Sequence, residues 1–313
     1  MRSITHVSIL LLSAACISVA AYGQAGDSAG PVVKVTVTAM PHRKDKVQPL
    51  NSQDVMVKEG KSRRPLVDFT PAGGANSDLD LAILIDDSLD TTFDTQLNSL
   101  RQFVQNLPPR VRVAIVYGEL GTASVLQNLT ANHALAAKAL RLPLGRVNEQ
   151  SSIYFSVMDL MKSWPARSRR HAVLLFSDGI DLFNGIMDSE PGINPDLQEA
   201  IDAAQRSGVT IYTIYANTAG YNRRNMFLIN NGQSCLGLLA LSTGGEAYQE
   251  GFNTPVDLTP FLKQMLERLN NQYLVSFRAL PEKKAGFQQV KFTTELPGME
   301  LQGPERVFVP ASE

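Results

Sequence analysis

The sequence has 313 residues, of which 44% are hydrophobic and 19% are charged, and its formal net charge is −1. This composition is typical of an ordinary globular protein, and the length suits one large domain with a smaller one. A chain so close to neutrality has no overall field that favours nucleic acid or an anionic membrane. We therefore expect neither nucleic acid nor a membrane surface as a partner.

The first 23 residues have the pattern of an export signal. A positive charge precedes the apolar residues 7–21, and Ala21 and Gly23 are small residues at the two positions that a signal peptidase reads. Residues 1–23 are therefore predicted to be a signal peptide, which places the mature chain in the periplasm or outside the cell. The alternatives are a retained anchor and a lipoprotein anchored through Cys16. No later segment is apolar enough to span a bilayer.

The chain has two cysteines, Cys16 and Cys235. Removal of the signal peptide would leave Cys235 without a partner in the same chain, so stability has to come from core burial. We expect Cys235 to be a small buried hydrophobic residue rather than a reactive thiol.

Residues 31–70 form a predicted N-terminal β segment. Alternating β-branched residues predict a strand at 32–38, and shorter strands are expected at 55–61 and 65–69. Residues 71–77 are rich in glycine and small residues and are typical of a linker.

From residue 79 the pattern changes to strands that alternate with helices. Strands are predicted at 79–85, 111–117, 171–176, 209–215 and 246–248, with a short edge strand at 123–129. Helices are predicted at 92–107, 131–142, 153–164, 196–207, 236–242 and 256–270. Such alternation indicates a Rossmann-like, doubly wound α/β domain, whose mostly parallel sheet is flanked by helices. We assign it to residues 78–272.

Residues 273–313 return to a β pattern, with strands predicted at 273–278, 288–293 and 306–309. Neither this segment nor the N-terminal one has enough strands for independent stability. We therefore expect the two segments to pack together into a small β module.

The most informative stretch is an apolar run at 81–85 that ends in Asp86-Asp87-Ser88-Leu89-Asp90. An uninterrupted apolar run predicts a strand buried on both faces, and open α/β sheets bind ligands at the carboxyl ends of such strands. Asp86, Ser88 and Asp90 alternate, so an extended chain would point them the same way, and a tight loop could fold them round one cation.

Two other segments are expected at the same edge of the sheet. The strand at 171–176 is followed by Asp178, and Ser151 stands at the start of a predicted helix. Together with Asp86, Ser88 and Asp90 these residues form the predicted metal site. Ligands that are all oxygen suit magnesium, with calcium or manganese as alternatives, rather than zinc.

These motifs resemble the metal-ion-dependent adhesion site of the von Willebrand factor type A (VWFA) domain. The family's first motif, Asp-x-Ser-x-Ser, stands here as Asp86-Asp87-Ser88-Leu89-Asp90, its loop threonine corresponds to Ser151, and its second aspartate corresponds to Asp178-Gly179. The resemblance covers about residues 79–272. The segments 50–61 and 271–277 extend it to secreted bacterial VWFA-related proteins of the acidobacterial type. It implies a divalent cation and a protein or glycan ligand.

Asp90 departs from the family motif, which has serine at this position. As a ligand it would raise the protein's charge at the site to −3 and repel an acidic partner. The alternative is that Asp90 caps the next helix by accepting from the amide of Thr92 or Phe93. We expect Asp87 to face solvent and Asp181 to stabilise its own loop.

Three functions follow from these residues. The first is an extracytoplasmic binding or adhesion module without covalent chemistry. The second is a structural scaffold with a degenerate metal site, and the third is a metal-dependent hydrolase. An enzyme is disfavoured because a haloacid-dehalogenase-type phosphatase needs aspartate where Ser88 stands, and because no phosphate-binding loop or histidine–nucleophile pair is evident. The ligand itself is not identified.

Overall fold

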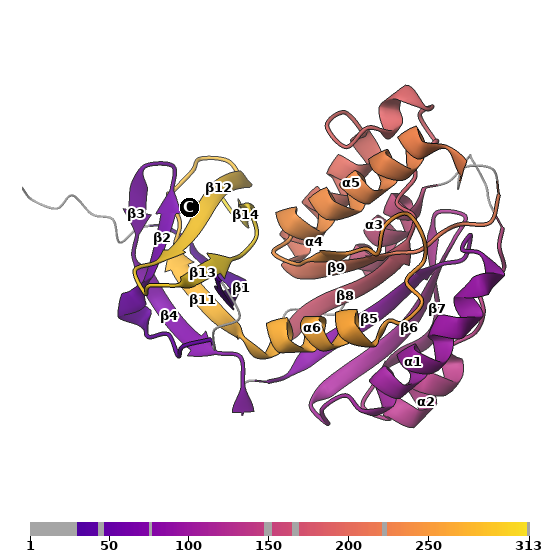
Figure 1. Cartoon of the computed structure of the whole chain (residues 1–313). Coiled ribbons are helices and arrows are strands. Elements are labelled where there is room, and N and C mark those ends of the chain that lie inside the picture. Colours follow the sequence, from indigo (N-terminus) through magenta and orange to yellow (C-terminus); the bar gives the residue numbers. More distant parts are fainter. Residues whose placement is uncertain are drawn as a thin grey trace, which may run out of the picture.

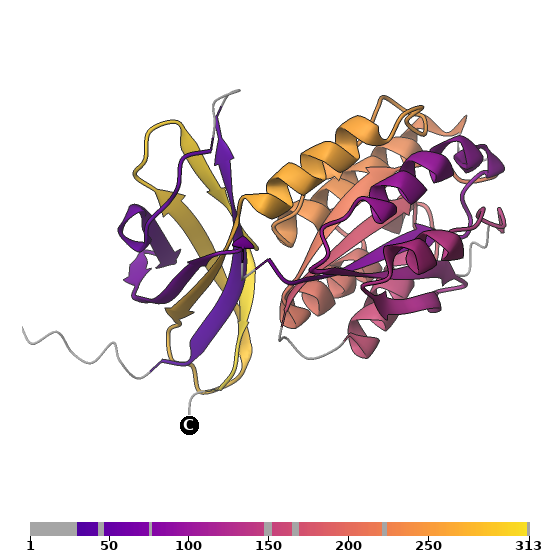
Figure 2. The ribbon, with the colours of Figure 1, turned by 90° about the horizontal axis from the view of Figure 1, so that it is seen from below.

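The computed structural model describes residues 30–42, 47–74, 77–146, 152–164, 169–220 and 224–311. The predicted signal peptide and Ser151 lie outside these residues. The chain forms an α/β domain and a smaller β module that lie side by side, with helix α6 (Thr259–Asn270) leading from one to the other (Figures 1 and 2).

The α/β domain is built on a six-stranded sheet. Its strands are β5 (Leu79–Asp86), β6 (Val111–Glu119), β7 (Thr122–Thr130), β8 (Arg170–Ser177), β9 (Val209–Tyr215) and β10 (Ala247–Tyr248). Their spatial order is β10-β9-β8-β5-β6-β7, and every neighbouring pair is parallel except β6–β7. This is the order of a doubly wound sheet, so the predicted fold class is confirmed.

Residues 81–85 of strand β5 are all apolar because helices cover both faces of the sheet. Leu81, Ile83 and Ile85 pack in one core cluster, and Ala82 and Leu84 pack in the other. The first cluster includes residues of α1 (Asp94–Gln105), α2 (His133–Ala139) and α6. The second includes residues of α3 (Ile153–Ser163), α4 (Pro195–Ser207) and α5 (Met226–Ser242). No helix of the described residues is long and apolar enough to cross a membrane.

Helix α5 is the main departure from the predicted helices, because it begins at Met226 rather than at residue 236. Asn225 caps it by accepting from the amides of Phe227 and Leu228. The first half contains two asparagines and Gly232, which are poor helix formers, so the sequence pattern hides it. Gly208, with φ of 63°, ends α4 as expected.

The β module combines the two ends of the chain, as predicted. Its two sheets have the orders β13-β1-β11-β4 and β14-β12-β2-β3. The N-terminal elements are β1 (Val32–Pro41), η1 (Ser52–Asp54), β2 (Val55–Glu59), β3 (Ser62–Arg64) and β4 (Leu66–Pro71), and the C-terminal strands are β11 (Gln272–Arg278), β12 (Gly286–Thr294), β13 (Met299–Gln302) and β14 (Arg306–Val309). β1 pairs with β11 and β13, and β2 pairs with β12.

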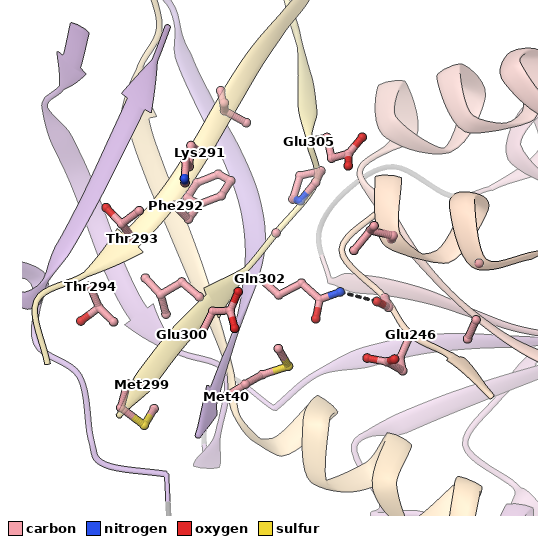
Figure 3. A pocket seen from close by; sticks show the side chains of 18 residues that line it. Met40, Glu246, Lys291, Phe292, Thr293, Thr294, Met299, Glu300, Gln302 and Glu305 are labelled. Atoms are coloured by element: carbon pink, nitrogen blue, oxygen red, sulfur yellow. Dashed lines mark hydrogen bonds between the residues drawn. The ribbon is translucent and has the colours of Figure 1, made fainter. Parts of the chain in front are cut away.

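Buried polar contacts join the module to the α/β domain. The Arg170 guanidinium donates to the carbonyls of Leu269 and Ser77 and to the Gln272 side chain, and burial lowers its pKa to about 10. A cleft of about 780 Å³ lies beside this junction, where Gln302 of β13 donates to the Gly245 carbonyl (Figure 3). The junction is therefore built from specific contacts, although these enclose no core.

Candidate metal centre

The predicted acidic residues lie at the point where the order of the strands in the sheet reverses. The chain first adds β6 and β7 on one side of β5, and then adds β8, β9 and β10 on the other side. Asp86 ends β5, and Asp178 directly follows the adjacent β8. Ligands of open α/β sheets bind at such a switch point, outside the carboxyl ends of the strands.

The Asp86 carboxylate is 8% exposed and is held by hydroxyl and amide groups. Its Oδ1 accepts from the Ser88 amide at 3.0 Å and from Ser88 Oγ at 2.6 Å, and its Oδ2 accepts from Ser177 Oγ at 2.7 Å. Burial raises the pKa of Asp86 because removal from water disfavours the charged form. The short loop 86–88 therefore brings the carboxylate and the Ser88 hydroxyl together.

Asp178 is buried close by. Its Oδ1 accepts from the Ile180 amide at 2.9 Å, and its Oδ2 accepts from Thr218 Oγ1 at 2.8 Å. Burial, together with the negative charge of Asp86, raises the pKa of Asp178 to about 7. The two carboxylates thus lie near enough to repel each other.

A third loop, which sequence analysis missed, completes the arrangement. Residues 217–219 follow β9 and bond to the first acidic loop: Leu89 bridges Thr218, the Ala219 amide donates to the Ser88 carbonyl at 3.0 Å, and the Asp90 amide donates to the Asn217 carbonyl at 2.9 Å. Thr218 and Ser177 therefore add hydroxyl oxygens to the site. Their positions after or at the end of buried strands are the signal that could have identified them.

Asp90 caps the turn η3 (Thr91–Phe93), and its Oδ1 accepts from the Thr92 amide at 2.9 Å. This is the capping alternative that the sequence predicted, and ligation by Asp90 stays a prediction.

The segment that follows Ser151 lies against the second acidic loop. Ser152 caps α3 by accepting from the Tyr154 amide, and the Tyr154 hydroxyl donates to the Gly179 carbonyl at 2.8 Å. The start of α3 is therefore close to Asp178. Whether the hydroxyl of Ser151 joins the site stays a prediction, because this residue lies outside the described part of the chain.

The expectation that Asp87 faces solvent is wrong. Asp87 is 1% exposed, and Arg141 donates to both of its carboxylate oxygens, at 2.7 and 3.0 Å. The Leu144 amide adds a third bond. The loop after α2 folds back over the end of β5, and no local sequence pattern announces that contact.

Two other expectations agree with the structure. Asp181 stabilises its own loop by accepting from the Phe183 amide and from the Asn194 side chain. Cys235 is fully buried, and burial raises the pKa of its thiol to about 12.

The groups around Asp86 and Asp178 decide whether a cation fits between them. No Lys, Arg or His of the described residues lies within ion-pair distance of Asp86 or Asp178. The described residues contain no group of three His, Cys, Asp or Glu side chains that could hold a metal, so a cation here has to rely partly on hydroxyl oxygens. Two carboxylates with the Ser88 hydroxyl, oriented by the hydroxyls of Ser177 and Thr218, suit a hard cation such as Mg²⁺.

Comparison with known proteins finds likeness only among solved structures, since no family model and no curated protein matches the sequence. An aerotolerance-related membrane protein from Bacteroides fragilis is 11% identical with a TM-score of 0.44, and the match covers 61% of this chain and 98% of that one. The vWF domain of the type V pili tip protein Mfa5 from Porphyromonas gingivalis is 16% identical with a TM-score of 0.43, covering 62% and 95%.

The human COPII-coat protein Sec24c is also similar, at 11% identity and a TM-score of 0.45, with 75% of this chain and 44% of that chain covered. Of these structures, that of Mfa5 is a vWF domain. None of the three is named as an enzyme. At this level of similarity, the matches assign no function, and the fold class rests on the strand order described above.

Proposed function

We propose that this chain is a non-enzymatic, extracytoplasmic binding module that recognises a protein or glycan through a divalent cation, most simply Mg²⁺. The observation that carries the proposal is the pair of buried carboxylates, Asp86 and Asp178, whose described partners are hydroxyl and amide groups. The extracytoplasmic location rests on the predicted signal peptide at residues 1–23.

The electrostatics of the pair support a cation. Burial of a carboxylate is costly unless a counter-charge or a proton compensates it. Without a counter-charge, Asp178 retains a proton up to a pH of about 7. A divalent ion would offset both charges, and a bound ion would supply positive charge to an oxygen of the partner.

The chain's own residues would hold that ion with oxygen atoms. Asp86, Ser88 and Asp178 lie together at the carboxyl edge, and Ser151 and Asp90 are the further predicted ligands. Ser177 and Thr218 orient the two carboxylates through the hydrogen bonds that they donate. Such outer-shell partners set the direction and basicity of a ligand.

The test is thermal unfolding of the mature chain with Mg²⁺, Ca²⁺ or Mn²⁺ and with a chelator. A ligand that binds only the native state stabilises it by about 2.7 kcal/mol at a concentration of one hundred times Kd. We expect the cation to raise the melting temperature of the wild-type protein and of the control Glu199→Gln by similar amounts. The cation should leave the melting temperature of Asp86→Asn unchanged.

If none of the three ions raises the melting temperature of the wild-type protein, the chain is better described as a structural scaffold with a degenerate metal site. Turnover of simple phosphate or ester substrates would instead support the hydrolase. A pull-down of envelope and secreted proteins, with and without chelator, then identifies the ligand.

A further inference from the structure

The turn of the β6–β7 hairpin holds Leu120 in a backbone conformation that is unfavourable for leucine. Glu119 pairs with Thr122, so Leu120 and Gly121 form a two-residue turn, with φ of 50° and 79°. Two positive φ values define a type I′ turn, in which asparagine and glycine are preferred. Leu120 is the one non-glycine residue with positive φ in the described part of the chain, and it is 59% exposed.

Leu120 belongs to a larger apolar surface. A Cβ on Gly121 would lie 3.2 Å from Phe155, and the ring of Phe155 packs edge-on against Phe183 with centroids 4.9 Å apart. Ile186 and Met187 follow Phe183 in the same connection between β8 and α4. Phe183, Ile186 and Met187 are 49%, 53% and 68% exposed.

We call Leu120, Phe155, Phe183, Ile186 and Met187 the rim patch. It lies at the carboxyl edge of the sheet that also carries the candidate metal centre, because Gly118, two residues before Leu120, pairs with Asp86. Several exposed apolar side chains at one edge of a domain mark an interaction surface in soluble proteins. The unfavourable backbone of Leu120 supports the same conclusion, because strained residues that persist cluster at functional sites.

The charges at the Met187 end of the patch are negative. The connection at residues 178–194, which carries Phe183, Ile186 and Met187, contains four Asp and Glu and no Lys, Arg or His. Asp188 and Glu190, immediately after Met187, are partly exposed, and no basic side chain of the described residues lies within ion-pair distance of either. On the Leu120 side, Arg146 is bonded to Glu119 at 2.9 Å.

The geometry points to a partner of defined chemistry: we propose that the rim patch binds a protein segment that presents lysine or arginine beside exposed apolar side chains. A second copy of this chain would bring two acidic connections together, and an anionic membrane would be repelled by the same charges. The inference rests on the proposed function as a binding module and goes beyond it by naming the partner's chemistry.

The probe is a short fluorescent peptide of alternating leucine and lysine, compared with one that has glutamate for lysine and one that has serine for leucine. We expect the leucine–lysine peptide to bind at least about tenfold more tightly than either control peptide, a difference of about 1.4 kcal/mol. Binding should weaken with added salt, because exposed charges are screened.

The decisive variant is Leu120→Asn. It relieves the unfavourable turn, so it should raise the melting temperature while it weakens peptide binding severalfold. If Leu120 had a purely structural role, Leu120→Asn would raise the melting temperature and leave peptide binding unchanged. Met187→Ser should weaken binding without the gain in stability, and Val67→Ser, a similarly exposed valine at 51% on β4, is the matched control that leaves binding unchanged.

Equal binding by wild type, Leu120→Asn and Met187→Ser would overturn the proposal, as would preference for the glutamate peptide. Binding to vesicles of anionic lipid that the two variants abolish would assign the patch to a membrane. Self-association that they abolish would assign it to a second copy.

The two proposals fail separately. Calorimetry with Mg²⁺ alone reports the metal centre, and peptide binding in chelator reports the patch. If Mg²⁺ binds and the peptide does not, the patch proposal is wrong. If the peptide binds and Mg²⁺ does not, the metal proposal is wrong.

Discussion

The two ends of strand β5 each bury an aspartate, and the two carboxylates have opposite surroundings. At the amino end, Asp80 is 1% exposed and accepts from Arg112 at 2.6 and 2.8 Å and from Arg169 at 2.8 Å. At the carboxyl end, the Asp86 side chain accepts from Ser88 and Ser177, and no basic side chain of the described residues pairs with it.

Strand register explains the difference. Asp80 stands beside Arg112 in the parallel pairing of β5 with β6, and Asp86 stands beside Gly118 in the same pairing. One end of the sheet therefore neutralises its own buried charge, and the other end has two carboxylates without a basic partner among the described residues. The role of a buried carboxylate is therefore indicated by its bonding partners and not by its burial alone.

The largest effect is expected at the amino end. Asp80→Asn leaves Arg112 without its carboxylate and leaves Arg169 with Asp78 alone. It should lower the free energy of unfolding by about 2 kcal/mol, since hydrogen bonds to charged groups contribute about that much. Urea unfolding measures this difference. Asp86→Asn, measured in chelator, should lower the free energy of unfolding far less. Equal losses in the two variants would contradict the difference between the two ends of β5.

At the carboxyl end the large effect is on metal affinity. Asp178→Asn should weaken Mg²⁺ binding by more than about hundredfold, because loss of an outer-shell partner alone costs up to that factor. Thr218→Val removes only such a partner and should cost about tenfold. Calorimetry with Mg²⁺ measures both, and wild-type affinity in Asp178→Asn would remove this residue from the site.

The pH dependence of the metal-free protein tests the charge of Asp178. Its pKa of about 7 in the folded state lies above the ordinary value of 3.8, so the folded state retains a proton that the unfolded state has lost. Stability should therefore fall as pH rises from about 4 to about 7 through this group. Urea unfolding in chelator should show a flatter profile for Asp178→Asn, and Mg²⁺ affinity should fall below pH 7.

A smaller gain is expected from the hairpin beside the site. Leu120→Asn should raise the free energy of unfolding by about 1 kcal/mol, because asparagine tolerates the left-handed conformation that leucine does not. Thermal unfolding measures the gain. A loss of stability would show that the leucine side chain packs in a way that offsets its backbone.

The smallest effect concerns Asp90. Asp90→Ser retains a residue that caps helices well, so stability should change by less than about 0.5 kcal/mol. Mg²⁺ affinity separates the two interpretations of this residue: unchanged affinity leaves Asp90 as a cap, and a marked change makes it a ligand.

Local patterns were sufficient for much of the fold. The apolar runs of β5 and β8 and the helical spacing between them predict a doubly wound sheet, and the acids that follow those strands predict its edge. The pattern did not reveal the start of α5, where asparagine and glycine weaken the helical signal. It also missed β3 and β13, which have three and four residues.

The sequence by itself determined where carboxylates enter the sheet, because strand ends are local features of the chain. Only the tertiary structure decided which of them are neutralised. Asp87 meets Arg141, which lies 54 residues away, and Asp178 meets Thr218, which lies 40 residues away. Such pairs depend on strand register and on the path of distant loops, and a short stretch of sequence determines neither the register nor the path.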